Sequence, residues 1–482
     1  MSKKQKRTIF IIIIIIVGLL FSYSIYVQSK LYDGIESKEF KTSVKELTDA
    51  AEEIQSTDNI RSLITQWAKN SNIKYTVDEN NNIIIKQKSS RSRANSERTL
   101  IALEYNNKLF LKNINAYAAA EYYAKHGLNG SNVTVLFLYN DGNYHTGARN
   151  ISKKYIPKNS RLILLTQGTK SYISRNSLTN TMQTVSIPVK KVSKDCDSAI
   201  QIRIGGLTTD VPSGSYQDNP IDTLNTILTR LKTKSIAFQL ANVKVENSGN
   251  MYPTGITATI LLNSYSLESV TSYLEDRQDK FLDDNKEDFP DVYYEFEELT
   301  ENIPTKAYSS KEIDRLITFL YTYKNGNYRF GKDDVPEGYE ENDLYGTNCV
   351  ENLWVDGNTL KVRISTTAIS NKYLKQITKE NKEAASLSKV TINTDVTYPL
   401  FSNSSKTLME LIQSSYTKVN DTTTVDATIE EDTDSTFTAL TFLSAKNKNI
   451  DAVHVQLPDS SPVKVSNAIL NYPVMELNIF GF

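Results

Sequence analysis

The fold of this chain is best indicated by the stretch Val133-Thr-Val-Leu-Phe-Leu-Tyr-Asn-Asp-Gly-Asn-Tyr-His-Thr-Gly-Ala148. Its first part, Val133–Tyr139, is an almost uninterrupted apolar run. Runs of this kind are typical of strands buried on both faces, which occur mainly in parallel sheets covered by helices. The polar residues that follow, Asp141 among them, should then lie at the carboxyl end of a buried strand.

The residues on either side of this stretch continue the same pattern. A helical stretch at 115–125 precedes it, and apolar strands are expected at 99–105 and 161–166. Alternation of buried strands with helices favours an α/β layer with a mostly parallel sheet.

The pattern changes near residue 198 and returns near 398. Polar and apolar residues alternate in between, which predicts strands at 199–204, 236–245 and 255–262. Such alternation indicates an α+β unit with one sheet face packed on helices. We therefore predict an α/β domain made of residues 39–197 and 396–482, interrupted by an inserted α+β domain at 198–395.

The N-terminus has the pattern of a membrane anchor. Ile9–Val27 is almost wholly apolar, and a helix of this length spans about 28 Å, close to the hydrocarbon thickness of a bilayer. Lys3, Lys4, Lys6 and Arg7 precede it, which keeps the short tail cytoplasmic. A cleaved signal peptide begins similarly, but no small-x-small site follows. The sequence predicts a cytoplasmic tail (1–8), a transmembrane signal-anchor (9–28), a stalk (29–38) and an extracytoplasmic bulk at the cell membrane.

Composition narrows the functional classes. The 482 residues carry a net charge of −1, so there is no basic surface for nucleic acid. The abundance of Lys, Asn, Ile, Ser, Thr and Tyr is typical of a bacterial protein from an AT-rich genome. The two cysteines, Cys196 and Cys349, allow either one disulfide or two buried thiols.

Four segments carry a family resemblance, and their order along the chain matters as much as each one. They are the opening stretch 133–148, then Ile202-Arg-Ile-Gly-Gly-Leu-Thr-Thr-Asp-Val-Pro-Ser-Gly214, then Tyr398-Pro-Leu-Phe-Ser-Asn-Ser-Ser-Lys-Thr-Leu408, and the tail 438–462. Together they resemble zinc exopeptidases of the aminoacylase/carnosinase type, and especially the aminoacyl-histidine (Xaa-His) dipeptidases. The resemblance implies a split zinc-exopeptidase-like domain with an inserted lid domain, which agrees with the pattern above.

The resemblance also implies where the family's two zinc ions would bind. Such ions lie about 3.5–4 Å apart and activate a bridging water. The family's ligand and general-base positions fall in this sequence on Glu104, Asn106, Asn115 (or Asn113), Asp141, Gly142, Thr166 and Ser460. In the lid, the substrate-binding histidine corresponds to Val211 or Pro212, and an arginine to Ser365. Glycine offers no side-chain ligand, and amides and hydroxyls are poor ligands for zinc, so we expect the site to be lost and no zinc cofactor to bind.

Two of these positions, Glu104 and Asp141, still carry carboxylates that are suitable ligands for Ca²⁺. Glu104 and Asp141 should face each other across the sheet edge, where they would hold one Ca²⁺ with Asn106 and Asn115, or simply line a solvated polar cleft. The three histidines, His126, His145 and His454, have no metal-binding spacing, which favours structural or surface roles.

The sequence thus predicts a membrane-anchored pseudo-peptidase that binds a peptide or a cell-envelope ligand without cleaving it, or that serves as a scaffold. A scaffold would use the lid to form a homodimer or to bind an envelope protein. The alternative is a residual metal-dependent dipeptidase or other hydrolase.

Overall fold

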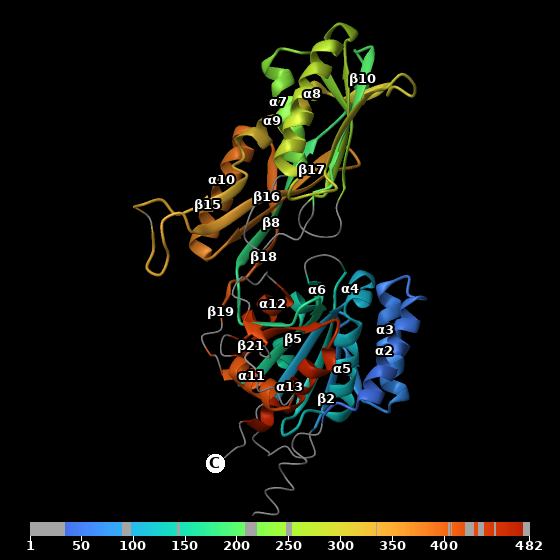
Figure 1. Ribbon diagram of the computed structural model, residues 1–482, viewed down its shortest axis with the longest axis vertical. Coiled ribbons are helices and arrows are strands. Elements are labelled where there is room, and N and C mark those ends of the chain that lie inside the picture. The colour runs from blue at the N-terminus through green and yellow to red at the C-terminus, as the bar shows by residue number, and fades with distance from the viewer. Residues whose placement is uncertain are drawn as a thin grey trace, which may run out of the picture. The chain divides into compact units, whose positions relative to one another are not determined.

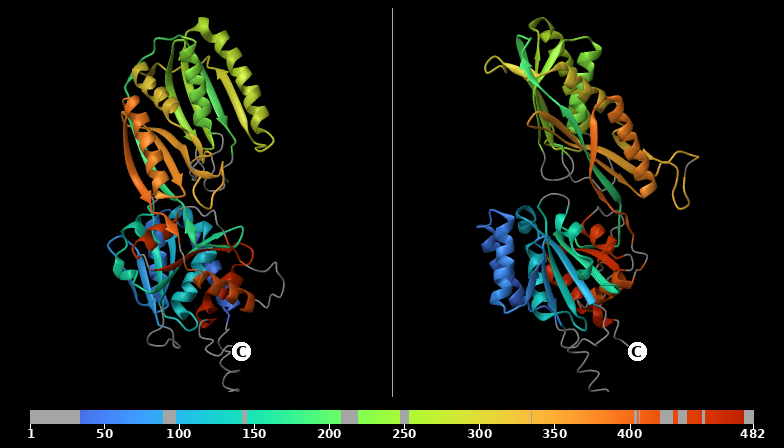
Figure 2. Two further views of the ribbon diagram at one scale, coloured as in Figure 1. Left: turned by 90° about the vertical axis from the view of Figure 1, so that its left-hand side faces the viewer. Right: turned by 180° about the vertical axis from the view of Figure 1, so that it is seen from behind.

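The computed structural model describes residues 34–88, 98–141, 145–207, 219–246, 253–333, 335–402, 405, 407–419, 429–431, 438–447 and 450–475. The chain divides into two compact units: unit 1 comprises Met1–Ser177 and Phe401–Phe482, and unit 2 comprises Leu178–Leu400 (Figures 1 and 2). The predicted anchor lies outside the described residues. Within the described part, no helix is both long and apolar enough to cross a membrane.

Unit 1 is built on an eight-stranded sheet in the order β1-β2-β4-β3-β5-β21-β6-β20. Its centre is parallel and consists of β4 (Val133–Tyr139), β3 (Arg98–Tyr105), β5 (Ser160–Gly168) and β21 (Asp451–Pro458). The outer strands are β1 (Tyr75–Val77), β2 (Ile83–Gln87), β6 (Tyr172–Ser174) and β20 (Glu430–Glu431). Because β2 and β6 pair antiparallel with their inner neighbours, the sheet is mixed, with the expected parallel strands at its centre.

Helices cover both faces of this sheet. They are α2 (Ser37–Ala51), α3 (Thr57–Asn70), α4 (Asn107–Lys112), α5 (Ile114–His126), α6 (Thr146–Asn150), α11 (Thr407–Val419), α12 (Ala439–Ala445) and α13 (Pro462–Met475). The main core joins α2, α3, α5, α11 and α13 to one face of the sheet. Buried alanines of α5, such as Ala116 and Ala120, let this helix lie close to the strands.

The two large antiparallel sheets of unit 2 share one hydrophobic core with four helices, and a short two-stranded sheet pairs β9 (Lys191–Ser193) with β14 (Lys306–Tyr308). One sheet has the order β11 (Phe238–Glu246), β12 (Gly255–Leu262), β10 (Ser198–Gly205), β13 (Tyr293–Glu298). The other has the order β15 (Gly326–Arg329), β16 (Leu344–Asp356), β17 (Thr359–Ala368), β8 (Thr179–Pro188), β18 (Thr391–Tyr398). The helices are α7 (Pro220–Thr233), α8 (Ser264–Asn285), α9 (Ser310–Thr322) and α10 (Asn371–Leu387).

The structure places the boundaries of the insertion at Leu178 and Leu400, outside the expected 198 and 395. The reason is strand pairing. β8 pairs with both β17 and β18 in the five-stranded sheet, so the residues before 198 belong to unit 2. Both cysteines of unit 2, Cys196 and Cys349, are free buried thiols, which decides between the two alternatives left open by the sequence.

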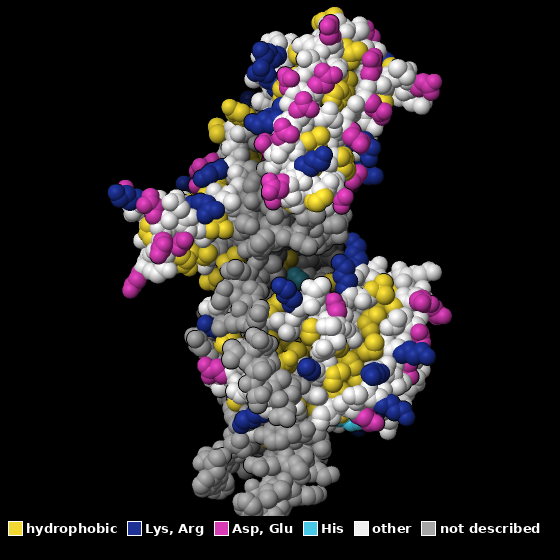
Figure 3. Space-filling view, in the orientation of Figure 1, with side chains coloured by type: hydrophobic (Ala, Val, Ile, Leu, Met, Phe, Trp, Pro, Cys, Tyr) yellow, Lys and Arg dark blue, Asp and Glu magenta, His cyan; other side chains and the backbone are white. Residues whose placement is uncertain are grey.

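Acidic side chains gather over α8 on the surface of unit 2 (Figure 3). They include a run that extends from Asp283 near the end of α8 to Glu298 at the end of β13, and each acidic residue of this run is exposed. The run is a solvated face of the unit.

The helix α6 lies against the end of β4 through a glycine. The amide of Asn82 donates to the carbonyl of Gly147 over 3.2 Å, and its side-chain oxygen accepts from the backbone N–H of Tyr139 over 3.0 Å. A Cβ atom at Gly147 would lie 2.2 Å from Asn82 Oδ1 and 2.4 Å from the Tyr139 carbonyl oxygen. Only glycine fits at this position without moving the backbone of β4.

We expect Gly147→Ala to destabilise unit 1 by roughly 3 kcal/mol, because overpacking against backbone outweighs the helix propensity of alanine. Urea unfolding would be followed by the fluorescence of Trp67, in a Trp354→Phe background that removes the second tryptophan of the chain. Gly331→Ala, in unit 2, is a control that should leave unit 1 as stable as in wild type, since a Cβ there meets nothing within 4 Å. Equal stability of the two variants would contradict the close packing of α6.

Candidate functional site

The four parallel strands of unit 1 end at one edge of the sheet, and polar residues follow each of them. They are Glu104 at the end of β3 and Asn106 after it, Asn140 and Asp141 after β4, Thr166 and Gln167 at the end of β5, and Asp459 and Ser460 after β21. In open α/β sheets, ligands bind beyond the carboxyl ends of the strands. This edge is therefore the candidate functional site, and most of the predicted positions lie along it.

Glu104 is the central acid of the edge. One of its carboxylate oxygens accepts a hydrogen bond from the amide of Asn140 over 3.1 Å. The other lies 2.6 Å from Nδ1 of His145, and the two side chains are only 12% and 21% exposed. His145 adopts a left-handed backbone conformation, with φ of 57°, directly before α6. This turn carries the imidazole onto Glu104, a contact that the sequence did not predict.

Asp141 has a different environment from Glu104. It is exposed, and its carboxylate accepts a hydrogen bond from the hydroxyl of Thr146 at the start of α6. The predicted Ca²⁺ site would need both carboxylates, yet each oxygen of Glu104 already has a partner in Asn140 or His145. Among the residues that the structure describes, no group of three or more His, Cys, Asp or Glu side chains is placed to hold a metal ion.

Amide side chains connect the strand ends to the neighbouring helix starts. Asn106 caps α4, where its oxygen accepts from the backbone N–H groups of Lys108 (2.9 Å) and Leu109 (2.7 Å). Asn113 accepts from the backbone N–H of Gln167 over 2.8 Å, and the Gln167 side chain accepts from the backbone N–H of Asn115 over 2.7 Å. These bonds fix the start of α5 to the end of β5.

Gln167 extends this network to the last strand of the parallel set. Its amide nitrogen donates to the carboxylate of Asp459 over 2.6 Å, and the backbone N–H of Asp459 donates to Gly168 over 2.9 Å. Ser460, the predicted counterpart of the family's last histidine, follows and is exposed. The sequence missed both Gln167 and Asp459, although each is a polar residue at the end of an apolar strand.

Thr166 and His454 form a hydroxyl–imidazole pair, with 2.7 Å between Oγ1 and Nε2. His454 is 5% exposed, and its burial lowers its pKa to about 4, so the ring is neutral near pH 7. Its Nδ1 has no hydrogen-bond partner among the residues that the structure describes. A nucleophile–base pair needs a base of suitable pKa that a third group orients. Among the described residues this pair shows neither feature, and it links β5 to β21 through its hydrogen bond.

Four predicted positions remain, and only Ser365 lies among the described residues. Gly142, Val211 and Pro212 lie outside the described residues. Ser365 lies on β17 in unit 2, where its hydroxyl accepts from the amide of Asn180 over 2.7 Å in a buried position.

Zinc favours imidazole nitrogen, thiolate and carboxylate ligands. The described residues at the predicted positions supply one carboxylate, Glu104, that is bonded to His145 and Asn140, and one exposed carboxylate, Asp141. The others are amides or hydroxyls, several of which are already bonded within the chain. This set of side chains does not fit a pair of zinc ions.

Comparison with known proteins finds similarity to solved structures only, and therefore in the fold. No family model and no curated protein sequence matches it. Among solved structures it is similar to an aminoacylhistidine dipeptidase from Vibrio alginolyticus, with a TM-score of 0.59 and 12% identity over 87% of this chain and 92% of that chain. A tripeptidase from Staphylococcus aureus gives a TM-score of 0.48 and 8% identity, over 92% of this chain and 99% of the other.

A metallo-carboxypeptidase of the M20 family from Sulfolobus solfataricus gives a TM-score of 0.38 and 13% identity, over 86% of this chain and 96% of the other. The likeness to the Vibrio enzyme shows that the chain has the fold of an aminoacylhistidine dipeptidase, as its sequence resemblance implied.

The low pKa of His454 predicts a specific acid sensitivity. An unfolded histidine binds a proton below about pH 6.5, whereas the folded one resists it until about pH 4. The contribution of His454 to the free energy of unfolding is therefore constant above pH 6.5 and falls as the pH drops toward 4, by an amount on the order of 3 kcal/mol.

Urea unfolding at pH 7 and pH 4.5, again followed by Trp67 fluorescence in the Trp354→Phe background, tests this sensitivity. In His454→Gln, the free energy of unfolding should differ much less between the two pH values than in wild type. His126→Gln, which changes an exposed histidine of the same unit, should show the same difference as wild type. Equal acid sensitivity of wild type and His454→Gln would refute the assignment.

Proposed function

We propose that this protein is a non-hydrolytic relative of the dipeptidases, a pseudo-peptidase that binds a peptide or a peptide-containing envelope ligand at the carboxyl edge of its parallel sheet. The observation that carries the proposal is the pairing of Glu104 with His145 and Asn140. A carboxylate at a position where the family resemblance implies a metal ligand instead forms hydrogen bonds within the chain. These hydrogen bonds join the ends of β3 and β4 and the start of α6 through side chains of the chain itself.

The chemistry of the edge suits a peptide ligand. Its amide side chains, Asn106, Asn113, Asn140 and Gln167, belong to a class that both donates and accepts, as peptide groups do. Asp141 is exposed and acidic, which would attract an N-terminal ammonium group or a basic side chain. Recognition of this kind needs fixed hydrogen-bonding groups, and the network from Asn113 through Gln167 to Asp459 supplies rigidity.

The location that we propose for this activity is the outer surface of a cell membrane, with a single N-terminal helix as the anchor. The basic and apolar pattern of residues 1–28 supports this part of the proposal. An anchored binding protein would hold its ligand near the envelope, which agrees with a role in binding or scaffolding rather than in digestion.

A scaffold that dimerises through the edge of the sheet in unit 2 is less favoured. The edge strand β13 carries the exposed acids Glu295, Glu297 and Glu298. Pairing two copies of this strand would bring like charges together, and charged residues on an edge strand oppose such association. We therefore favour ligand binding over homodimerisation as the function of this protein.

The zinc content of the full-length protein separates the proposal from a residual hydrolase. After incubation with zinc and removal of the excess, we expect mass spectrometry to find no stoichiometric zinc, and no cleavage of aminoacyl-histidine dipeptides. About two zinc ions per chain together with turnover would overturn the proposal, because they would require a di-metal site of other residues.

Binding is tested separately by titrating the protein with short peptides that have a free N-terminus. We expect saturable heat without turnover, and at least a tenfold weaker affinity in Glu104→Gln, because loss of the charge releases His145 and loosens the edge. Glu53→Gln, at an exposed acid outside the site, is the matched control and should bind as wild type does. Absence of binding across the peptide set would contradict peptide recognition.

A further inference from the structure

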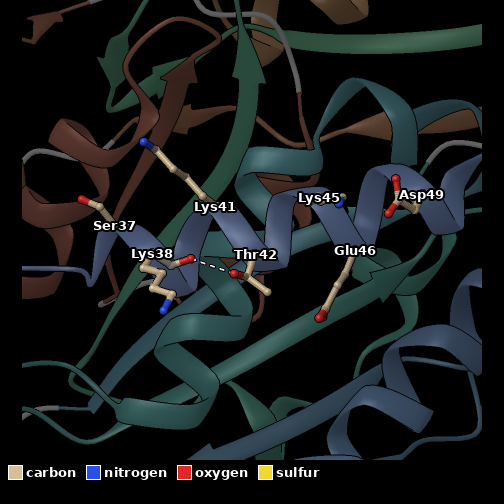
Figure 4. Close-up of a pocket in the computed structure, with 7 residues that line it drawn as sticks. All are labelled: Ser37, Lys38, Lys41, Thr42, Lys45, Glu46 and Asp49. Carbon is tan, nitrogen blue, oxygen red and sulfur yellow. Dashed lines mark hydrogen bonds between the residues drawn. The ribbon is translucent and has the colours of Figure 1, made fainter.

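A hollow of about 760 Å³ lies in unit 1 among α2, α3 and α5, apart from the carboxyl edge of the sheet. Its apolar lining includes Leu47, Leu63, Trp67 and Tyr122, and Glu46 and Glu121 line it as well. We call this hollow the helix groove. Figure 4 shows the side chains of α2 around a neighbouring open hollow, and Lys38, Thr42 and Glu46 line both. The groove has the size of a small-ligand site.

Glu121 is the unusual residue of the helix groove. It is 5% exposed and lies on the buried face of α5, among alanines and tyrosines. One carboxyl oxygen accepts a hydrogen bond from the Ser43 hydroxyl of α2 over 2.5 Å. No hydrogen bond from the described residues reaches the other oxygen, Oε1.

Nearby charges do not compensate this acid. On α5, Lys125 and His126 bind Glu39 of α2, with distances of 2.6 Å and 3.0 Å to its carboxylate. On α2, the negative charge of Glu46 raises the pKa of Glu121 further, and Lys38 also lines the groove. The groove-lining residues of α3 are uncharged. Burial, with a smaller effect from Glu46, raises the pKa of Glu121 to about 8 in spite of the bond from Ser43.

We propose that the helix groove binds an alkylammonium group, with Glu121 as its counter-ion and Trp67, Leu63 and Tyr122 around its hydrocarbon stem. An unpaired buried carboxylate is unfavourable, and an alkylammonium would supply the opposite charge while its hydrocarbon stem packs against the apolar lining. Aromatic side chains add cation–π attraction to such a group. The ammonium comes either from a free aliphatic amine or from a lysine side chain of a peptide. This site is separate from the carboxyl edge and stands independently of its proposed function.

Binding must be linked to the release of a proton. Glu121 is mostly protonated at pH 7 and must ionise before it pairs with a cation. The affinity should therefore rise about tenfold for each pH unit up to about pH 8 and level off above it. An amine held only by the exposed acids of the rim would show little change over this range.

The test is calorimetric titration of the full-length protein at pH 6.5, 7.5 and 9, with cadaverine in one arm and Nα-acetyl-lysine methylamide in the other. We expect binding that strengthens with pH by at least tenfold between 6.5 and 9, with uptake of the released proton by the buffer. Binding of both probes identifies the ammonium group as the recognised chemistry, and binding of the lysine derivative alone identifies a peptide lysine as its source. Failure of both probes at pH 9 would overturn the proposal.

Glu121→Gln keeps the shape of the side chain and an oxygen that can accept from Ser43, and it should abolish binding in both arms. Trp67→Leu, which keeps Glu121, should weaken binding by several-fold while retaining its dependence on pH. Glu53→Gln serves again as the control outside the groove. Thermal unfolding at pH 9 verifies folding, because removal of a buried acid should make Glu121→Gln at least as stable as wild type there. Unchanged amine binding in a folded Glu121→Gln protein would also overturn the proposal.

Discussion

The parallel pairing of β4, β3, β5 and β21 is the constraint on which the rest of unit 1 depends. Strand β21 lies beyond the insertion in sequence, yet it pairs with β5 in register from Asp451↔Arg161 to Pro458↔Gly168. Burial of these strands on both faces supplies the hydrophobic driving force. Their common direction brings every carboxyl end to one edge, where the polar groups must find partners in one another, in water or in a ligand. The site is thus a consequence of the topology.

Much of this architecture could be predicted because its signal is strong. A continuous apolar run such as Val133–Tyr139 has few structural solutions, and the alternation after residue 198 indicates a different kind of sheet. The boundaries of the insertion could not be placed as well. Strands β8 and β18 are rich in threonine and asparagine, and several of their polar side chains, such as Asn180 and Thr181, are buried in unit 2. Hydrophobic patterning does not reveal a strand whose buried groups are polar.

In the candidate site, some residues could be predicted from the sequence and others could not. Glu104 could be placed at the sheet edge because it ends an apolar strand, and family resemblance pointed to the same position. Its partner His145 could not be predicted, since their contact depends on a left-handed turn before α6 and on the close packing of Gly147 against β4. Gln167 and Asp459 meet across two strands that are far apart in sequence, so no local pattern connects them.

Two largely buried acids of unit 1, Glu104 and Glu121, differ in the partners that surround their carboxyl groups. At the sheet edge, Glu104 has a hydrogen-bond partner for each oxygen, the amide of Asn140 and the imidazole of His145. In the helix groove, Glu121 has a hydroxyl on one oxygen, while the adjacent cations of α5 are bound to Glu39. Uncompensated burial of an acid is unfavourable. Of these two acids, Glu121 is the one that lacks a cationic partner among the described residues, and it lies in the helix groove, away from the edge where the family resemblance would place metal ions.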